Sequence, residues 1–137
     1  MNALFTAIYN KLIANTAGDL YVAVGGRFYL NHAPQNATFP YCVFSQIISV
    51  HEIDFGEERE DTLIQFDIFS ENNSADEAGD ILGYLKTLMD DCALTVTGWR
   101  HVTFSRGNVY PNNDFSQVPP IHGYSVEYNV MIEKTKS

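Results

Sequence analysis

The chain has 137 residues, of which 45% are hydrophobic and 13% aromatic, and this composition is that of one folded domain over residues 1–137. Its 8 lysine and arginine residues against 17 aspartate and glutamate residues give a formal net charge of −9. This acidic balance disfavours a domain that grips nucleic acid by its phosphates, because such binding depends on clustered basic side chains.

The spacing of the two cysteines and the absence of long apolar runs indicate in which compartment the chain folds and whether it contacts a membrane. Cys42 and Cys92 lie far apart without a C-x-x-C pair, which disfavours a disulfide framework and a thiolate zinc site and favours reduced thiols in a cytosolic compartment. No stretch approaches the roughly 20 apolar residues of a membrane span, and the first residues lack the features of a signal peptide. We therefore expect no association with a membrane.

The first element is an amphipathic helix. Apolar residues recur at i, i+4 and i+8 from Leu4 to Leu12, and this spacing predicts a helix over residues 3–14. Residues 20–24 are a short apolar piece that fits either a strand or a tight connection, and Gly25-Gly26 ends it.

A proline-bracketed turn leads into the sheet. Arg27–Leu30 is a short strand candidate. Pro34 and Pro40 fix their own φ angles and favour extended geometry in the preceding residues, so this segment is predicted to be a rigid loop that delivers a strand over residues 41–50.

That strand is apolar on both sides. One face carries Cys42, Phe44, Ile48 and Val50, and the opposite face carries Tyr41, Val43 and Ile47. A strand with two apolar faces is covered on both or contacts another chain on one of them. We therefore predict a subunit interface at Tyr41, Val43 and Ile47.

An acidic segment separates this strand from the next one, which alternates cleanly over residues 62–70. It is longer than a simple turn requires and is predicted to be a long β-hairpin arm. Its charged residues are Glu52, Asp54, Glu57, Glu58, Arg59, Glu60 and Asp61. Six carboxylates repel one another, and either a partner or solvation must accommodate them. We expect this arm to contact a partner or to line a lumen.

The residue pattern in the second half of the chain predicts one more helix and several strands. Ser74 and Glu77 form a capping box at the start of a helix that reaches about residue 91. Strands are predicted over residues 94–96, 99–105 and 121–133, with a long polar loop over 107–120 and a short tail over 134–137. The predicted fold is α+β, with a mostly antiparallel sheet of four to five strands, two helices packed on one face and the acidic arm.

No catalytic or metal-binding motif is present. The histidines show no H-x-x-x-H or H-E-x-x-H spacing, although His101 and His122 lie on neighbouring predicted strands and could meet across the sheet. Neither Cys42 nor Cys92 has a neighbouring His or Lys that would lower its pKa. We predict no catalytic residue, no metal and no cofactor.

The order of elements resembles a known family. The segments that carry the resemblance are Arg27-Phe28-Tyr29, Ala33-Pro34-Gln35, Phe39-Pro40-Tyr41-Cys42-Val43-Phe44, Ile64-Gln65-Phe66-Asp67-Ile68-Phe69-Ser70 and Ser74-Ala75-Asp76-Glu77-Ala78. Over roughly residues 3–133 the chain is similar to the tail completion, or tail terminator, family of long-tailed bacteriophages and related prophages. The loop over 107–120 is a departure from that pattern.

The resemblance implies a structural virion protein and not an enzyme. It implies an oligomeric ring, a hexamer, that caps the tail tube, stops its polymerisation and forms the head–tail joining surface. The implied partners are the chain itself, the major tail tube protein and a head–tail connector or neck protein, in a virion tail assembled in the cytoplasm of the bacterial host. DNA would pass through without specific binding, and an acidic lumen made by Glu57, Glu58, Glu60 and Asp61 would suit that passage.

Three alternatives stay open from the sequence. The first is a neck or head-completion connector protein, which belongs to the same class. The second is a small enzyme or metal-binding module with an unrecognised site, and the third is a monomeric adaptor domain.

Overall fold

The structure is a computed structural model that describes residues 2–54, 57–71, 76–90, 92, 94, 96–116 and 120–134, with the side chains of residues 2, 49–58, 101 and 102 excepted. Its elements are α1 (Asn2–Ile13), α2 (Asp19–Val24), β1 (Phe28–Leu30), β2 (Tyr41–Asp54), β3 (Glu57–Ser70), α3 (Asp76–Met89), β4 (Trp99–Pro111) and β5 (His122–Lys134).

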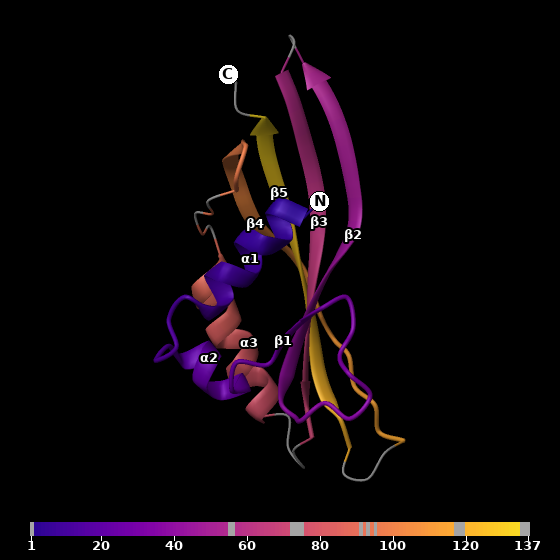
Figure 1. Ribbon diagram of the computed structural model, residues 1–137. Helices are drawn as coiled ribbons and strands as arrows, with labels where there is room; N and C mark the ends of the chain where they lie inside the picture. The colour runs from indigo at the N-terminus through magenta and orange to yellow at the C-terminus, as the bar shows by residue number, and fades with distance from the viewer. Residues whose placement is uncertain are drawn as a thin grey trace.

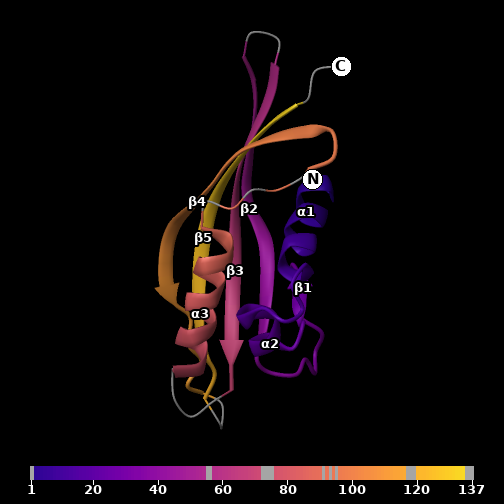
Figure 2. The same cartoon turned by 90° about the vertical axis from the view of Figure 1, so that its left-hand side faces the viewer.

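The strands form one sheet in the order β1-β2-β3-β5-β4. β1 pairs with β2 in parallel, and the other three neighbouring pairs are antiparallel. The helices lie together on one side of the sheet, and the ends of β2 and β3 extend beyond them (Figures 1 and 2). The predicted α+β class and mostly antiparallel sheet are confirmed, but three helices are present among the described residues where two were predicted.

The additional helix is α2, at the segment that fitted either a strand or a connection. Leu20 and Val24 are buried, and their i, i+4 spacing places both on one face of a short helix. Gly25 ends it in the left-handed region, with φ 60°, and the cap N–H groups bond to the carbonyl oxygens of Tyr21 and Val22. The sequence did not indicate this helix because its two valines have low helix propensity. Burial of Leu20 and Val24, and not propensity, stabilises so short a helix.

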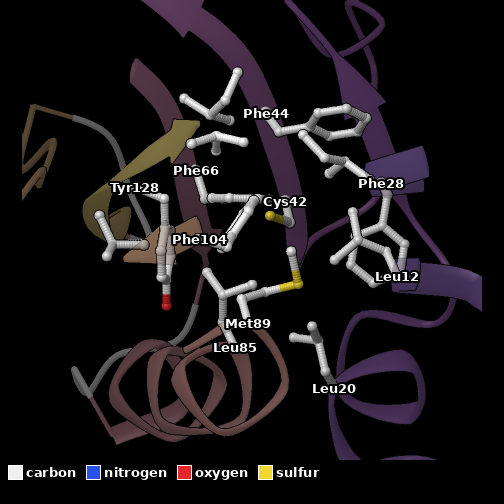
Figure 3. Packing of buried hydrophobic residues seen from close by; sticks show 14 of the residues in the cluster. Leu12, Leu20, Phe28, Cys42, Phe44, Phe66, Leu85, Met89, Phe104 and Tyr128 are labelled. Carbon is white, nitrogen blue, oxygen red and sulfur yellow. The ribbon is translucent and has the colours of Figure 1, made fainter. Parts of the chain in front are cut away.

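The core lies between the helices and one face of the sheet (Figure 3). The predicted stripe of α1 is buried at Leu4, Ile8 and Leu12. α3 buries Leu85 and Met89 with similar spacing. The sheet contributes alternate residues, among them Cys42, Phe44, Ile64, Phe66, Ile68, Val126, Tyr128 and Phe104. Alternation follows from the two-residue period of a strand, so the opposite face of the sheet carries the intervening residues.

A β-bulge in β2 moves the side chains that follow it to the other face of the sheet. Gln46 pairs with the buried Ile64, but the register shifts and Ile48 pairs with Leu63. One extra residue in a strand moves the following side chains to the other face. The prediction that Ile48 shares a face with Cys42 and Phe44 is therefore wrong, and Ile48 is 56% exposed.

The acidic segment is not shown as a separate arm. It forms the ends of β2 and β3, which pair up to Asp54 and Glu57, and β3 also pairs with β5 from Arg59 onward. The side chains of Glu52, Asp54, Glu57 and Glu58 lie outside the described residues.

The predicted loop over 107–120 is partly strand. β4 continues to Pro111, and Tyr110 pairs with Ser125. A second irregularity between Arg106 and Val109 lets the strand continue past Gly107 and Asn108. The predicted strand over 94–96 is also wrong for its described residues, because Val96 forms only an isolated bridge with Trp99.

The capping box of α3 is only partly observed. Ser74 lies outside the described residues. Glu77 instead accepts a hydrogen bond from the hydroxyl of Ser70 at 2.6 Å, and this bond ties the first turn of α3 to the end of β3.

Candidate protein-contact surface

The side of the sheet without helices is called here the outer face. Its residues alternate with the core residues along each strand and include Tyr41, Val43, Leu63, Gln65, Asp67, Phe69, Tyr110, Ser125, Glu127, Asn129 and Met131. This face carries an aromatic cluster near β1, an apolar patch beside the bulge of β2 and a polar network that reaches the end of β4.

The aromatic cluster surrounds Tyr41. Its ring lies 5.0 Å from Phe39, 5.8 Å from Tyr29 and 5.4 Å from Phe69, measured between centroids. Burial, and then the neighbouring Tyr29, raises the pKa of Tyr41 above its usual value. Tyr41, a predicted subunit-interface residue, thus contacts three aromatic rings of its own chain.

Arg27 fixes the proline loop against this cluster. Its Nε donates a hydrogen bond to the carbonyl oxygen of Pro40 at 3.0 Å, and Nη2 donates to that of Phe39 at 3.4 Å. The loop is thus held by a side chain as well as by its prolines.

The polar network crosses β3, β5 and the β4 end. Asp67 accepts hydrogen bonds from Nε2 of Gln65 at 2.8 Å and from the hydroxyl of Ser125. The hydroxyl of Tyr110 donates to Oε1 of Gln65 at 3.0 Å, and Nδ2 of Asn112 donates to the Ser125 hydroxyl at 3.3 Å. These groups satisfy one another, which is typical of a structural network.

The apolar patch lies beside the bulge. Ile47 is 46% exposed and Ile48 is 56% exposed. A shallow hollow of about 490 Å³ is lined there by Ile48, Asp61, Thr62, Leu63, Thr103, Asn129, Val130 and Met131. Exposed apolar side chains gathered in this way mark contact sites between proteins.

The predicted interface residues therefore have different environments. Ile47 is accessible to a partner, but Val43 is only 6% exposed and offers a partner little surface. Ile48 was missed because the face on which it lies depends on the bulge after Gln46, and no residue pattern indicates that bulge. The exposed end of β4 was missed because its polar sequence is typical of a loop, although Gly107 within a strand could have indicated a bulge.

The side chains with catalytic potential do not converge. Among the described residues no group of three His, Cys, Asp or Glu could hold a metal ion. His101 pairs with Ile132, which lies ten residues from His122 along β5 (132 − 122), so the two histidines, which could have met across the sheet, are not at neighbouring positions. Cys42 is fully buried, and burial raises the pKa of its thiol, with Asp67 adding to the effect.

Two further hollows in the described part of the chain also lack a group of three His, Cys, Asp or Glu side chains that could hold a metal ion. One of about 740 Å³ lies between the proline loop and Glu71 and Glu77, and another of about 350 Å³ lies among the three helices. In the part of the chain that the structure describes, no helix has the length and apolar character to cross a membrane.

An exposed apolar patch beside a self-satisfied polar network is typical of a surface that contacts another protein. The family model described as tail completion protein gp17 matches residues 6–109, which is 104 of 137 residues. The chain belongs to this bacteriophage family and is a structural tail protein.

Several solved structures resemble the chain, and one of them is similar over nearly its whole length. It is described as the virion of a native gene transfer agent particle, with a TM-score of 0.81, 14% sequence identity and coverage of 96% of each chain. At this identity the likeness concerns the fold. No curated protein sequence matches the chain.

Proposed function

We propose that the protein caps the end of the tail tube as an oligomeric ring, stops tube polymerisation and forms the surface that joins tail to head. The family match over residues 6–109 carries this proposal, because completion of a tail requires a protein that ends the tube. The fold likeness to a chain of a virion particle supports it. The partners would be copies of the chain, the major tail tube protein and a head–tail connector.

The ring follows from how such a cap must contact a tube. A tube end presents a ring of identical subunits, and a closed ring of copies would match that symmetry. By the resemblance noted from the sequence the ring is a hexamer. The exposed Ile47 and Ile48 provide an apolar contact, and the aromatic cluster and polar network support it with a rigid sheet.

The acidic ends of β2 and β3 suit a wall of the ring lumen. Negative charge would let DNA pass without binding, since phosphates are repelled. Glu60 and Asp61 are half-buried, and Arg59 lies 3.8 Å from Asp61. We propose that Glu57, Glu58, Glu60 and Asp61 face this lumen or the adjoining tube ring.

Assembly of tail tube protein in the presence of the chain tests this function. Light scattering gives the mass of the free protein, and negative-stain microscopy shows whether a ring sits at the tube end. A ring at one end of tubes of limited length supports the proposal. Binding to the connector or portal side without any binding to tubes would favour a neck or head-completion protein instead. A strict monomer that binds neither would favour an adaptor domain.

A further inference from the structure

The two edges of the sheet are both exposed. β1 pairs with β2 only from Cys42 to Phe44, with one more backbone hydrogen bond from Asn31 to Phe44. Beyond Phe44, in the part of the chain that the structure describes, β2 has a strand neighbour only on its β3 side. Gln46, Ile47 and Ile48 are exposed there. A strand edge of this kind carries unpaired N–H and C=O groups and is a template for another strand.

The other edge is β4. It pairs with β5 on one side, and among the described residues no strand lies on its other side. Every residue from Ser105 to Pro111 is exposed. This half of β4 lies at the border of the sheet, away from α1 (Figure 2).

Exposed hydrophobic side chains concentrate at these edges. Of nine large hydrophobic residues that are exposed in the described part of the chain, six lie at or beside the two edges. They are Leu30, Ile47 and Ile48 at the β1–β2 edge and Val109, Tyr110 and Phe115 at the β4 edge. Soluble proteins normally protect sheet edges with charge or cover, so exposed hydrophobic side chains at both edges indicate that a partner covers them.

Strand direction and charge make the two edges complementary. β2 is antiparallel to β3, β3 to β5 and β5 to β4, and therefore β2 and β4 run in opposite directions. A second copy in the same orientation would place its β2 antiparallel to β4 of the first. β4 carries Arg100 and Arg106 and no carboxylate, whereas the part of β2 beyond Phe44 carries Glu52 and Asp54 and no lysine or arginine. The two edges therefore differ in strand direction and in charge, and a head-to-tail contact needs two different, complementary surfaces on each copy.

We propose that copies of this chain join by edge-to-edge strand pairing, in which the exposed part of β2 of one copy pairs antiparallel with residues 105–111 of the next. The occupant of each edge is a second copy of the chain. This inference rests on the proposed ring and names its contact. The pairing is heterologous, so each copy uses both edges and the contacts can close into a ring.

Cysteine cross-linking tests the pairing. Ile48→Cys and Tyr110→Cys, which lie on the same face of the sheet, would be made in a Cys92→Ser background, in which the buried Cys42 is the one native thiol left. At millimolar protein, a short bismaleimide that tolerates a small shift in register would be added. The double variant should give a ladder of oligomers, and a mixture of the two single variants should stop at dimers. Either single variant cross-linking to itself as readily would overturn the heterologous pairing, and so would a double variant that remains monomeric.

Charge substitutions give the second measurement. Ile48→Lys places a positive charge opposite the basic β4 edge, and Tyr110→Asp, on the same face of the sheet, places a negative charge opposite β2, which carries Glu52 and Asp54. Each should therefore weaken self-association at least about tenfold in sedimentation equilibrium. Their combination should recover part of it. Val22→Lys is the matched control because Val22 is 64% exposed on α2, away from both edges. Equal association of the control and the edge variants would overturn the proposal.

The pairing and the tail function can fail separately. Tubes that are still capped by the edge variants would contradict the pairing and leave the proposed function intact. A cross-linked ladder from a protein that never limits tube growth would contradict the function and leave the pairing intact.

Discussion

Tyr128 provides a test of the core through a single hydroxyl group. The side chain is buried against Phe66 and Phe104, and its hydroxyl donates a hydrogen bond of 2.6 Å to Oδ1 of Asp90, just after α3. Oδ2 of Asp90 also lies 3.4 Å from Nη1 of Arg106, and the side chain of Asp90 is 33% exposed. The bond therefore links β5 to the end of α3, next to an ion pair on β4.

The substitution Tyr128→Phe removes this bond and leaves the ring packing in place. Asp90 retains Arg106 and some solvent, so the loss should be near the lower part of the range for a hydrogen bond to a charged group, about 1.5 kcal/mol. For a domain of this size that is a fall of about 3–6 °C in the unfolding midpoint. Thermal unfolding followed by circular dichroism at neutral pH measures it.

The same substitution has a defined pH dependence. Burial, followed by the hydrogen bond to Asp90 and the charge of Asp90, raises the pKa of Tyr128. The folded protein holds the phenol proton more tightly than the unfolded chain does. This contribution is complete below the usual tyrosine pKa of about 10 and is lost as pH rises from there through the folded-state pKa. The stability difference between wild type and Tyr128→Phe should therefore shrink in alkali.

The control is Tyr110→Phe, which removes a hydroxyl from an exposed tyrosine bonded to Gln65. It should change stability by no more than about 0.5 kcal/mol. A neutral-pH effect at Tyr128 no larger than that of the control, or a difference that grows with pH, would refute the reasoning about the buried hydroxyl.

Further substitutions test other parts of the structure. A Cβ at Gly123 would lie 2.7 Å or less from two backbone oxygens, whereas at Gly79 it would meet nothing within 4 Å. Gly123→Ala should therefore destabilise by about 1–3 kcal/mol, and Gly79→Ala in α3 should stabilise by about 0.5–1 kcal/mol, in urea unfolding. Arg27→Lys keeps the charge but loses the forked contact with the proline loop, and it should cost about 1–2 kcal/mol in the same assay. An aromatic disulfide reagent should modify the partly exposed Cys92 and leave Cys42 unmodified until the protein unfolds, and rapid labelling of both thiols would contradict the buried position of Cys42.

The sequence predicted those elements whose burial repeats with a regular period. The apolar stripe of α1 and the alternation of Ile64, Phe66 and Ile68 are long enough to define one face. The family resemblance was also confirmed, because it rested on several segments together.

The remainder depended on irregularities that a periodic pattern does not encode. The bulge after Gln46 reversed the facing of Ile48, and the irregularity after Arg106 let β4 continue through a sequence typical of a loop. For the predicted contact residues, burial of Val43 depends on its surroundings in the folded chain and not on its neighbours in sequence. The polar network around Asp67 likewise joins residues from separate strands.

Tube length is the most direct test of the proposed tail function. Purified tail tube protein would be polymerised with and without this protein, and the length distribution and the tube ends would be scored by negative-stain microscopy. The account predicts that added protein stops growth, narrows the lengths and leaves a ring at one end of each tube. Tubes that grow to the same lengths with uncapped ends would contradict it.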